Sequence, residues 1–139
     1  MKIQQIEPAV SIADAVTPDD LKEVAHRGFR TVICNRRPGE AEDHPGEESL
    51  RARAEALGLE WHSVPVSPGE YSDDDIESFG QALDHAPSPV LAFCRTGRRA
   101  VHLWAHARSR KPGCDIPGLL KAAHEAGHDP EPIREMIDG

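Results

Sequence analysis

The chain has 139 residues, of which 38% are hydrophobic and only 4% aromatic, enough for one core built mainly from aliphatic residues and alanine. Its net charge of −8, from 16 basic and 24 acidic residues, argues against general binding to nucleic acid or to an anionic membrane. No apolar run approaches the ~18 residues of a membrane span, no signal peptide is evident, and three widely spaced cysteines predict no disulfide framework, so we expect a cytoplasmic protein.

Helix and strand signals alternate along the chain. Val10–Ile12 predicts a short edge strand, and Thr17–Asp20 begins a helix with a capping hydroxyl, a first-turn proline and two acids. Gly28 ends that helix, and Phe29–Cys34 is expected to form a strand. The later elements are expected in this order: a polar loop at Asn35–Gly46, a helix around Leu50–Leu57, a strand at Leu59–Val66, a helix capped by Ser72, a strand at Val90–Phe93, a helix with an inner stripe from Ala100 to Ala107, and two short helices after Pro112-Gly113.

This alternation predicts an α/β fold with right-handed βαβ units. We expect three layers, αβα, in which helices cover both faces of a central, mainly parallel sheet of four or five strands. No repeat, low-complexity tract or linker interrupts the pattern, so a single domain over residues 1–139 is predicted.

The segment around Cys94 is the most informative part of the sequence. Cys94 follows the apolar strand Val90–Phe93, at the carboxyl end where open α/β sheets bind their ligands. The N–H groups of the next residues can surround an anion, and the following helix directs its positive dipole end toward it. These anion-binding loop residues are Arg95, Thr96, Gly97 and Arg98. The surroundings favour a reactive thiolate, and Arg99 can act as a two-pronged clamp for sulfate-like or phosphate-like oxygens.

Charge is distributed unevenly around this segment. Between His85 and Cys114 there is no acidic residue. The same stretch holds six basic residues, Arg95, Arg98, Arg99, Arg108, Arg110 and Lys111. A basic region centred on a cysteine in an acidic protein points to a small anionic ligand, and a solvated basic helix end is the alternative.

Several segments resemble a bacterial family, the β-lactamase-hydrolase-like phosphatase-like domain, which is also described as a rhodanese-like sulfurtransferase family. The matching segments are Thr17–Leu21, Gly28–Ile33, Asn35–Glu40, Pro65-Val66, Pro89–Arg99, Leu103–Ala105 and Ala126–Asp129. The resemblance implies a protein-tyrosine-phosphatase-like fold with Cys94 as nucleophile and Arg99 as anion clamp. It also implies a persulfide dioxygenase as a partner, because the family occurs fused to such enzymes. The chain departs from the family at Ala13-Asp14-Ala15, where the family has a glycine-glutamine pair.

The spacing of Cys94 and Arg99 bears on the reaction. Tyrosine phosphatases have five residues between cysteine and arginine, whereas this chain has four, and Ala100 stands at the phosphatase arginine position. A shorter loop draws its N–H groups inward, as in rhodanese-type sulfurtransferases. Phosphatases also protonate the leaving group from an aspartate before the cysteine, and the corresponding region, residues 64–71, offers only Glu70 as a substitute.

Both features favour a sulfurtransferase over a phosphatase. The Cys94 thiolate would take sulfur from an anionic donor, thiosulfate or a low-molecular-weight persulfide, and pass it to a thiol acceptor. The alternative is a phosphatase-like hydrolase of phosphate monoesters that acts through phosphocysteine. A third reading is a non-catalytic module that binds an anion or a persulfide.

Other polar residues follow the predicted strand that ends at Cys34. Asn35, Arg36 and Arg37 are candidate substrate contacts, and ion pairs of the two arginines with Glu40 or Glu42 are the alternative. Cys34 itself is expected to be a buried, inert thiol, whereas Cys114, in a loop, is expected to be exposed.

The histidines predict neither a metal site nor a cofactor site. His124-Glu125-Ala126-Gly127-His128 matches a zinc-protease pattern, but Gly127 is expected to end the helix before His128. His102 and His106 are expected to form a solvent-facing pair opposite the apolar stripe of their helix.

Overall fold

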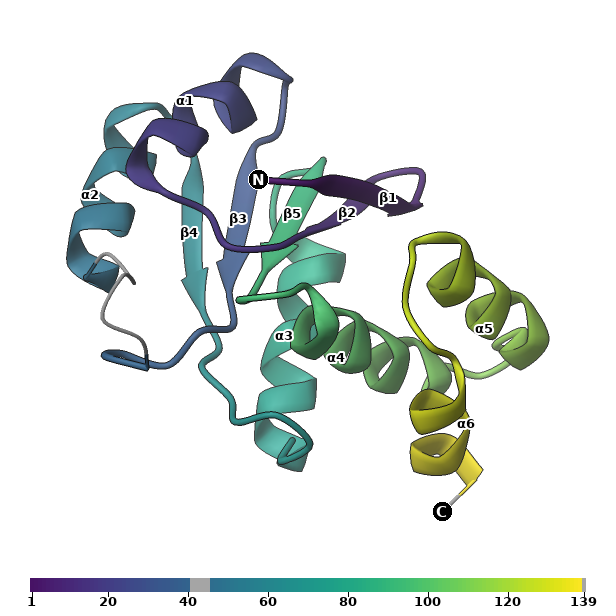
Figure 1. Cartoon of the computed structure of the whole chain (residues 1–139). Coiled ribbons are helices and arrows are strands. Elements are labelled where there is room, and N and C mark those ends of the chain that lie inside the picture. Colours follow the sequence, from purple (N-terminus) through teal and green to yellow (C-terminus); the bar gives the residue numbers. More distant parts are fainter. Residues whose placement is uncertain (41–45, 139) are drawn as a thin grey trace.

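The computed structural model describes residues 1–40 and 46–138. At its centre is a five-stranded sheet in the order β1-β2-β5-β3-β4 (Figure 1). The strands are β1 (Ile3–Glu7), β2 (Val10–Ala13), β3 (Thr31–Cys34), β4 (Glu60–Ser63) and β5 (Val90–Phe93). β2, β5, β3 and β4 run parallel, and β1 pairs antiparallel with β2. The predicted α/β fold with a mainly parallel sheet is therefore confirmed.

Helices cover both faces of the sheet (Figure 1). The helices are α1 (Pro18–His26), α2 (Glu47–Ala56), α3 (Asp73–His85), α4 (Arg98–Ser109), α5 (Ile116–Glu125) and α6 (Glu131–Asp138). α1 and α2 bury Leu21 and Leu50 in one apolar cluster with Leu91 of β5. α3 and α4 bury Phe79 and Leu103 in a second cluster on the opposite face, to which α5 and α6 also contribute. Alternate residues of β3 and β5 enter the two clusters, which is why these two strands are almost entirely apolar. β4, at the edge of the sheet, is mostly polar and buries Trp61 alone.

Local capping sets the starts of two helices, as the sequence predicts. Thr17 Oγ1 accepts a hydrogen bond from the N–H of Asp20 at 3.2 Å, and the Asp20 carboxylate accepts one from the N–H of Thr17 at 2.9 Å. Ser72 and Asp75 form the same reciprocal capping box at the start of α3. Each box satisfies N–H groups that a helix leaves unpaired in its first turn.

The N-terminal hairpin differs from the prediction. Val10–Ile12 was expected at the edge of the sheet, but β2 lies between β1 and β5 and is buried along its whole length. β1 forms this edge instead, and no strand was expected there from the sequence. Its residues Ile3–Glu7 are mostly polar, and of them Ile6 alone is buried, so the segment lacks an apolar signal and depends on pairing with β2.

The carboxyl ends of the four parallel strands meet at one edge of the sheet, and the loops that follow them therefore lie together there. β5 leads into Cys94, β3 into Asn35 and β4 into Val64. Residues 1–40 and 46–138 contain no helix that is both long enough and apolar enough to cross a membrane.

Candidate active site at Cys94

Cys94 lies directly after β5, and its side chain is buried. The chain turns through Arg95 and Thr96 to Gly97, the N-cap residue of α4. The N–H of Gly97 donates a hydrogen bond to Cys94 Sγ at 3.1 Å. The sulfur thus lies at the N-terminal end of a 12-residue helix, where free N–H groups and the helix dipole stabilise negative charge.

The turn requires glycine at position 97 for two reasons. Gly97 has φ +90°, a left-handed conformation that residues with a Cβ rarely adopt. A Cβ there would also lie 3.3 Å from the His128 ring and 3.3 Å from Ile12 Cγ2. The loop is therefore packed on its outer side against the segment after α5 and against β2.

Arg99 reaches back from the first turn of α4 to the carboxyl edge of the sheet. Its Nη1 donates to Glu40 Oε1 at 2.8 Å and its Nη2 to Glu40 Oε2 at 2.7 Å, a bidentate pair. Nη1 also donates to the Val66 carbonyl oxygen at 2.9 Å. Glu40 follows β3 and Val66 follows β4, so loops after two different strands fix the orientation of this guanidinium.

One edge of the guanidinium is left for an anion. Arginine has five N–H donors, and Glu40 and Val66 accept from both protons of Nη1 and one of Nη2, with the Asn35 carbonyl as a further, longer acceptor of Nη1 at 3.4 Å. The guanidinium also lies within hydrogen-bond reach of the Cys94 sulfur. Among the described residues, Nε–H and the second Nη2–H have no oxygen acceptor, and together they form a fork that fits two oxygens of an oxyanion. The hydrogen bond with Glu40 is the largest cause of the raised pKa of Arg99, and negative charge at Cys94 raises that pKa further.

Glu40 is the acceptor at the centre of this arrangement, and its side chain is only 7% exposed. Besides Arg99, it accepts hydrogen bonds from Arg36 Nε at 3.1 Å and from the N–H of Arg37 at 2.6 Å. The hydrogen bond from Arg99 is the main cause that lowers the pKa of the Glu40 carboxyl to about 2. Glu40 is therefore ionised at neutral pH and is a positioning residue for Arg99.

The three candidate substrate contacts after β3 have different surroundings. Asn35 is fully buried; its Nδ2 donates to the Val64 carbonyl at 3.0 Å, and its Oδ1 has no hydrogen-bond partner among the described residues. Arg36 is buried and pairs with Glu40, which is the alternative that the sequence left open, whereas Glu42 lies outside the described residues. Arg37 has an exposed side chain, and its contact with substrate stays a prediction.

The basic region is less open than the sequence suggested. Ion pairs join Arg108 to Glu7 and Asp84, Arg110 to Asp73, and Lys111 to Asp84. All three acids precede His85 in the sequence. The fold therefore neutralises three of the basic residues with carboxylates from other segments. Arg95 and Arg98 keep exposed side chains at the loop.

A tyrosine–histidine pair joins the segment after β4 to α4, and it was not expected from the sequence. Tyr71, from the segment between β4 and α3, has its Oη 2.9 Å from Nδ1 of His102 in α4. His102 was expected to face solvent, but it is only 4% exposed, because the Tyr71 segment covers that side of the helix. His106 is half-buried rather than solvent-facing, and its Nε2 lies 3.2 Å from Met136 Sδ. The signals available were that Tyr71 is the single tyrosine of the chain and lies in the loop where an acid was sought.

The other cysteines and histidines take up separate positions. Cys34 is fully buried, and burial is the main cause that raises its pKa to about 12, as expected of an inert thiol. Cys114 is half-buried rather than exposed. α5 ends at Glu125, so His128 lies beyond the helix, as predicted, and its ring packs against Gly97.

The segment after β2, where the sequence departs from the family, holds the loop through its backbone. The N–H of Ala15 donates to the Arg95 carbonyl at 3.1 Å, and the N–H of Cys94 donates to the Ala13 carbonyl at 3.4 Å. Both contacts use main-chain atoms, so they do not depend on which side chains stand at positions 14 and 15, whereas Ala13 is buried in the core.

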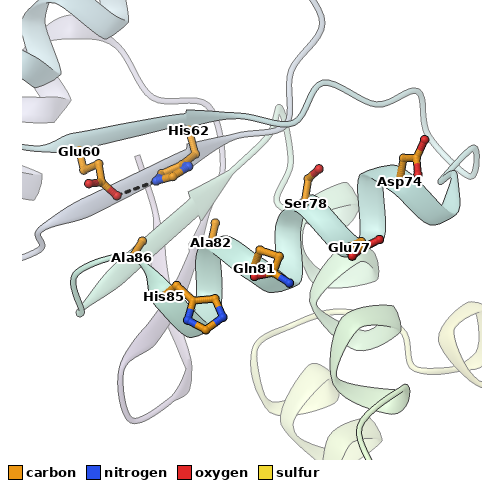
Figure 2. A pocket seen from close by; sticks show the side chains of 9 residues that line it. All are labelled: Glu60, His62, Asp74, Glu77, Ser78, Gln81, Ala82, His85 and Ala86. Carbon is orange, nitrogen blue, oxygen red and sulfur yellow. Dashed lines mark hydrogen bonds and ion pairs between the residues drawn. The ribbon is translucent and has the colours of Figure 1, made fainter.

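The large surface cavity shown in Figure 2 is not at this site. It has a volume of about 650 Å³ and lies between β4 and α3, where its lining includes Glu60, His62 and Glu77. A smaller cavity of about 130 Å³ borders the Cys94 loop and is lined by Thr96, Gly97 and His128 among others. Because Cys94 and Arg99 line neither cavity, we locate the candidate active site from hydrogen-bond geometry rather than from cavity size.

Comparison with curated proteins finds relatives among the beta-lactamase hydrolase-like proteins. One from Xylella fastidiosa (strain Temecula1) is 33% identical over 105 residues, which are 76% of this chain and 24% of the relative. One from Agrobacterium fabrum is 32% identical over 104 residues, 75% of this chain and 24% of the relative. The chain spans about a quarter of the length of these relatives.

Solved structures with the same fold are phosphatase-type proteins. A candidate phosphatase from Neisseria meningitidis superposes with a TM-score of 0.85 at 32% identity, covering 96% of this chain and 94% of that one. A candidate phosphatase from Shewanella putrefaciens gives 0.72 at 16% identity, with 97% and 87% coverage. TpbA from P. aeruginosa gives 0.64 at 16% identity, with 99% and 90% coverage. The last two are too distant to show more than the fold.

A family model described as "Beta-lactamase hydrolase-like protein, phosphatase-like domain" matches residues 2–111, which include β1 through α4 and the whole Cys94 site. The chain therefore belongs to the phosphatase-like domain family of the beta-lactamase hydrolase-like proteins.

Proposed function

We propose that this chain is a cysteine-dependent hydrolase of phosphate monoesters. The observation that supports it most is the orientation of Arg99: Glu40 and Val66 hold it so that its Nε–Nη2 edge is left for an oxyanion at the Cys94 loop. A phosphoryl group has three terminal oxygens to share between this edge and the N–H groups of the loop. The similar solved structures are phosphatase-type, and one of them, a variant of TpbA, was solved in complex with phosphotyrosine.

The proposed reaction has two steps. The Cys94 thiolate attacks phosphorus, the bond from phosphorus to the ester oxygen breaks, and the alcohol or phenol leaves after gaining a proton. A water molecule then attacks the phosphocysteine, phosphate is released, and the thiolate is restored. In both steps Arg99 and the loop N–H groups stabilise charge on the phosphoryl oxygens.

The sequence-based preference for sulfur transfer finds no support in the comparisons, which fit the phosphatase alternative better. The inference from four residues between Cys94 and Arg99 assumed that a shorter loop is too narrow for phosphate. The guanidinium of Arg99 nevertheless approaches from the first turn of α4 and is oriented by Glu40, so the residue count alone does not decide which anion fits.

One set of assays separates the three readings. A phosphatase hydrolyses aryl phosphates, is inhibited by vanadate, and yields a phosphorylated Cys94 that rapid acid quenching and mass spectrometry detect. Cys94→Ser is expected to reduce the rate to that of buffer alone. Sulfur loaded onto Cys94 from thiosulfate or glutathione persulfide, without aryl phosphate hydrolysis, would overturn the proposal in favour of sulfur transfer. Stabilisation by sulfate or phosphate with neither reaction would favour a binding module.

A further inference from the structure

Hydrolysis of a phosphate monoester needs a proton for the departing oxygen. Residues 64–71, where a phosphatase would supply an aspartate for this purpose, contain none. The segment between β4 and α3 has Glu70 as its carboxylate, and Glu70 is exposed at a turn where its N–H bonds to the Ser67 carbonyl at 3.1 Å. An exposed carboxylate on a surface turn is poorly placed to protonate a group bound at the buried Cys94 sulfur. Another donor is therefore required.

Tyr71, the next residue, has the geometry of such a donor. Its ring packs edge-on against the His102 ring, with centroids 5.8 Å apart and an interplanar angle of 84°, and its Oη lies 2.9 Å from His102 Nδ1. It also packs against the His106 ring at 5.8 Å. The contact with His102 Nδ1 therefore defines the position of the phenol oxygen, whereas His106 only borders the ring.

Two links connect this pair to the loop that carries the nucleophile. His102 lies one turn after Arg98 in α4, and the segment that carries Tyr71 is tied to Arg99 through the Val66 carbonyl. Burial is the largest cause of the raised pKa of Tyr71, and negative charge at Cys94 raises that pKa further, while Arg98 and Arg99 lower it. The phenol is therefore within electrostatic reach of the thiolate and of the arginine that clamps the anion.

His102 can hold the phenol in a donating orientation. Burial is the main cause that lowers the pKa of His102 to about 4, and the charges of Arg98 and of two other histidines lower it too, so the ring is neutral at neutral pH. In the tautomer that carries its proton on Nδ1, this ring donates to Tyr71 Oη. The phenol proton is then directed to another acceptor, and the same Nδ1–H stabilises the tyrosinate once that proton has left.

We propose that Tyr71 is the catalytic proton donor for the leaving group, with His102 as its positioning residue; this inference rests on the proposed phosphatase function. In the first step the Tyr71 hydroxyl gives its proton to the ester oxygen as the bond from phosphorus to that oxygen breaks. In the second step the tyrosinate takes a proton from the water that attacks phosphocysteine. The phenol is restored at the end of each cycle, so protons balance without any further reactant.

The test is the dependence of rate on the leaving group. Tyr71→Phe keeps the ring but removes the hydroxyl, and it is assayed on a series from 4-nitrophenyl phosphate, whose leaving group needs no proton, to phenyl and alkyl phosphates. We expect kcat/KM, which reports the first step and not the later hydrolysis of phosphocysteine, to fall by about 10²–10⁴-fold on the poor leaving groups and by much less on the nitrophenyl ester. A fall of equal size across the series, or none, would overturn the proposal.

Two further variants separate positioning from packing. His102→Asn places an amide near the position of Nδ1 and is expected to retain part of the leaving-group dependence that His102→Ala loses. His106→Asn is the matched control, because His106 touches the same tyrosine ring from the same helix while its Nε2 faces Met136. It is expected to leave the dependence unchanged, and a change as large as that of His102→Ala would contradict the assignment.

A measurement that needs no mutation uses the single tyrosine of the chain. Growth with fluorotyrosine alters the acidity of this one phenol, and kcat/KM on poor leaving groups is expected to change with it while kcat/KM on the nitrophenyl ester stays constant. If the proposed phosphatase function itself is wrong, the result differs: the wild-type chain would form no phosphocysteine with any ester. A wild type that forms phosphocysteine but shows no effect of Tyr71→Phe overturns only the assignment of Tyr71.

Discussion

At the scale of single residues, the ion pair between Glu40 and Arg99 does the most to define the site. A bidentate pair holds the guanidinium in one plane, which a single contact would not do. Both side chains are about 7% exposed, so solvent screens the pair little. Glu40 thereby settles which edge of Arg99 is left for a ligand.

This pair predicts a specific loss of stability in acid. The pKa of the Glu40 carboxyl falls from 4.5 to about 2 in the folded chain, mainly through Arg99. Because the folded-state pKa is the lower one, the stabilisation is complete above about pH 4.5 and disappears as the pH falls toward 2. A shift of this size corresponds to on the order of 3 kcal/mol in the free energy of unfolding.

Urea unfolding of the wild type and of Glu40→Gln at a series of pH values measures this difference. The stability gap between them should be widest near neutral pH and should close toward pH 2. Glu55→Gln is the control, because the pair of Glu55 with Arg51 is 3.8 Å long and exposed, where ion pairs contribute little. A gap that does not depend on pH would show that Glu40 stabilises the fold by packing alone.

At the scale of elements, the turn from β5 into α4 combines a left-handed glycine conformation with close packing. Gly97 has φ +90°, and a Cβ would press on His128 and Ile12 at 3.3 Å. The N–H of the same residue donates to the Cys94 sulfur. Any shift of this turn therefore moves a contact to the nucleophile.

Gly97→Ala is expected to lower both stability and anion binding. The left-handed conformation alone costs about 1–2 kcal/mol for alanine. Gly113→Ala is a matched control, because Gly113 has φ +77° but nothing within 4 Å of its Cβ position. Both variants should lose stability in thermal unfolding, Gly97→Ala more so, and only Gly97→Ala should weaken vanadate binding. Equal binding of vanadate by both variants would contradict the close packing at Gly97.

At the scale of the whole molecule, the sheet separates two apolar clusters, and Cys34 lies in the one beneath α1 and α2. Its side chain is fully buried, and its pKa is raised to about 12, mainly by burial. A thiol in this position becomes reactive only when the surrounding layers open.

Alkylation of Cys34 should therefore report global unfolding. In a Cys94→Ser/Cys114→Ser variant, labelling by iodoacetamide is expected to be negligible in buffer and to rise with urea in parallel with the loss of circular dichroism. Labelling well before that transition would show that the layer of α1 and α2 opens independently of the sheet. Labelling at a single cysteine makes the mass spectrum unambiguous.

The order of secondary structure could be predicted because its signals are local. Thr17 and Ser72 each carry their capping partner three residues later, and the apolar strands that lead to Cys34 and Cys94 are short and continuous. β1 could not be predicted in this way, since its mostly polar residues are ordered by pairing with β2. Local signals therefore predict most helices and strands, whereas the edge strand β1 depends on a pairing that these signals do not reveal.

The candidate site could be predicted only in part, for the same reason. Cys94 and Gly97 belong to one short segment and were identified together. Glu40 and Arg99 are 59 residues apart, and Tyr71 and His102 are 31 residues apart, so no spacing rule connects them. His102 was placed in solvent because one apolar stripe was assigned to α4, although α3, α5 and α6 all pack against this helix.

The three loops that meet at Arg99 have a consequence for protein engineering. Grafting the segment that runs from Cys94 to Arg99 into another scaffold would transplant the nucleophile but leave its guanidinium unsupported, because Glu40 and Val66 come from elsewhere in the chain. To transfer a working site, the loops after β3, β4 and β5 would therefore have to be transferred together. Exchanging the loops after β3 and β4 between relatives offers a way to change which anion is preferred, without altering the segment from Cys94 to Arg99.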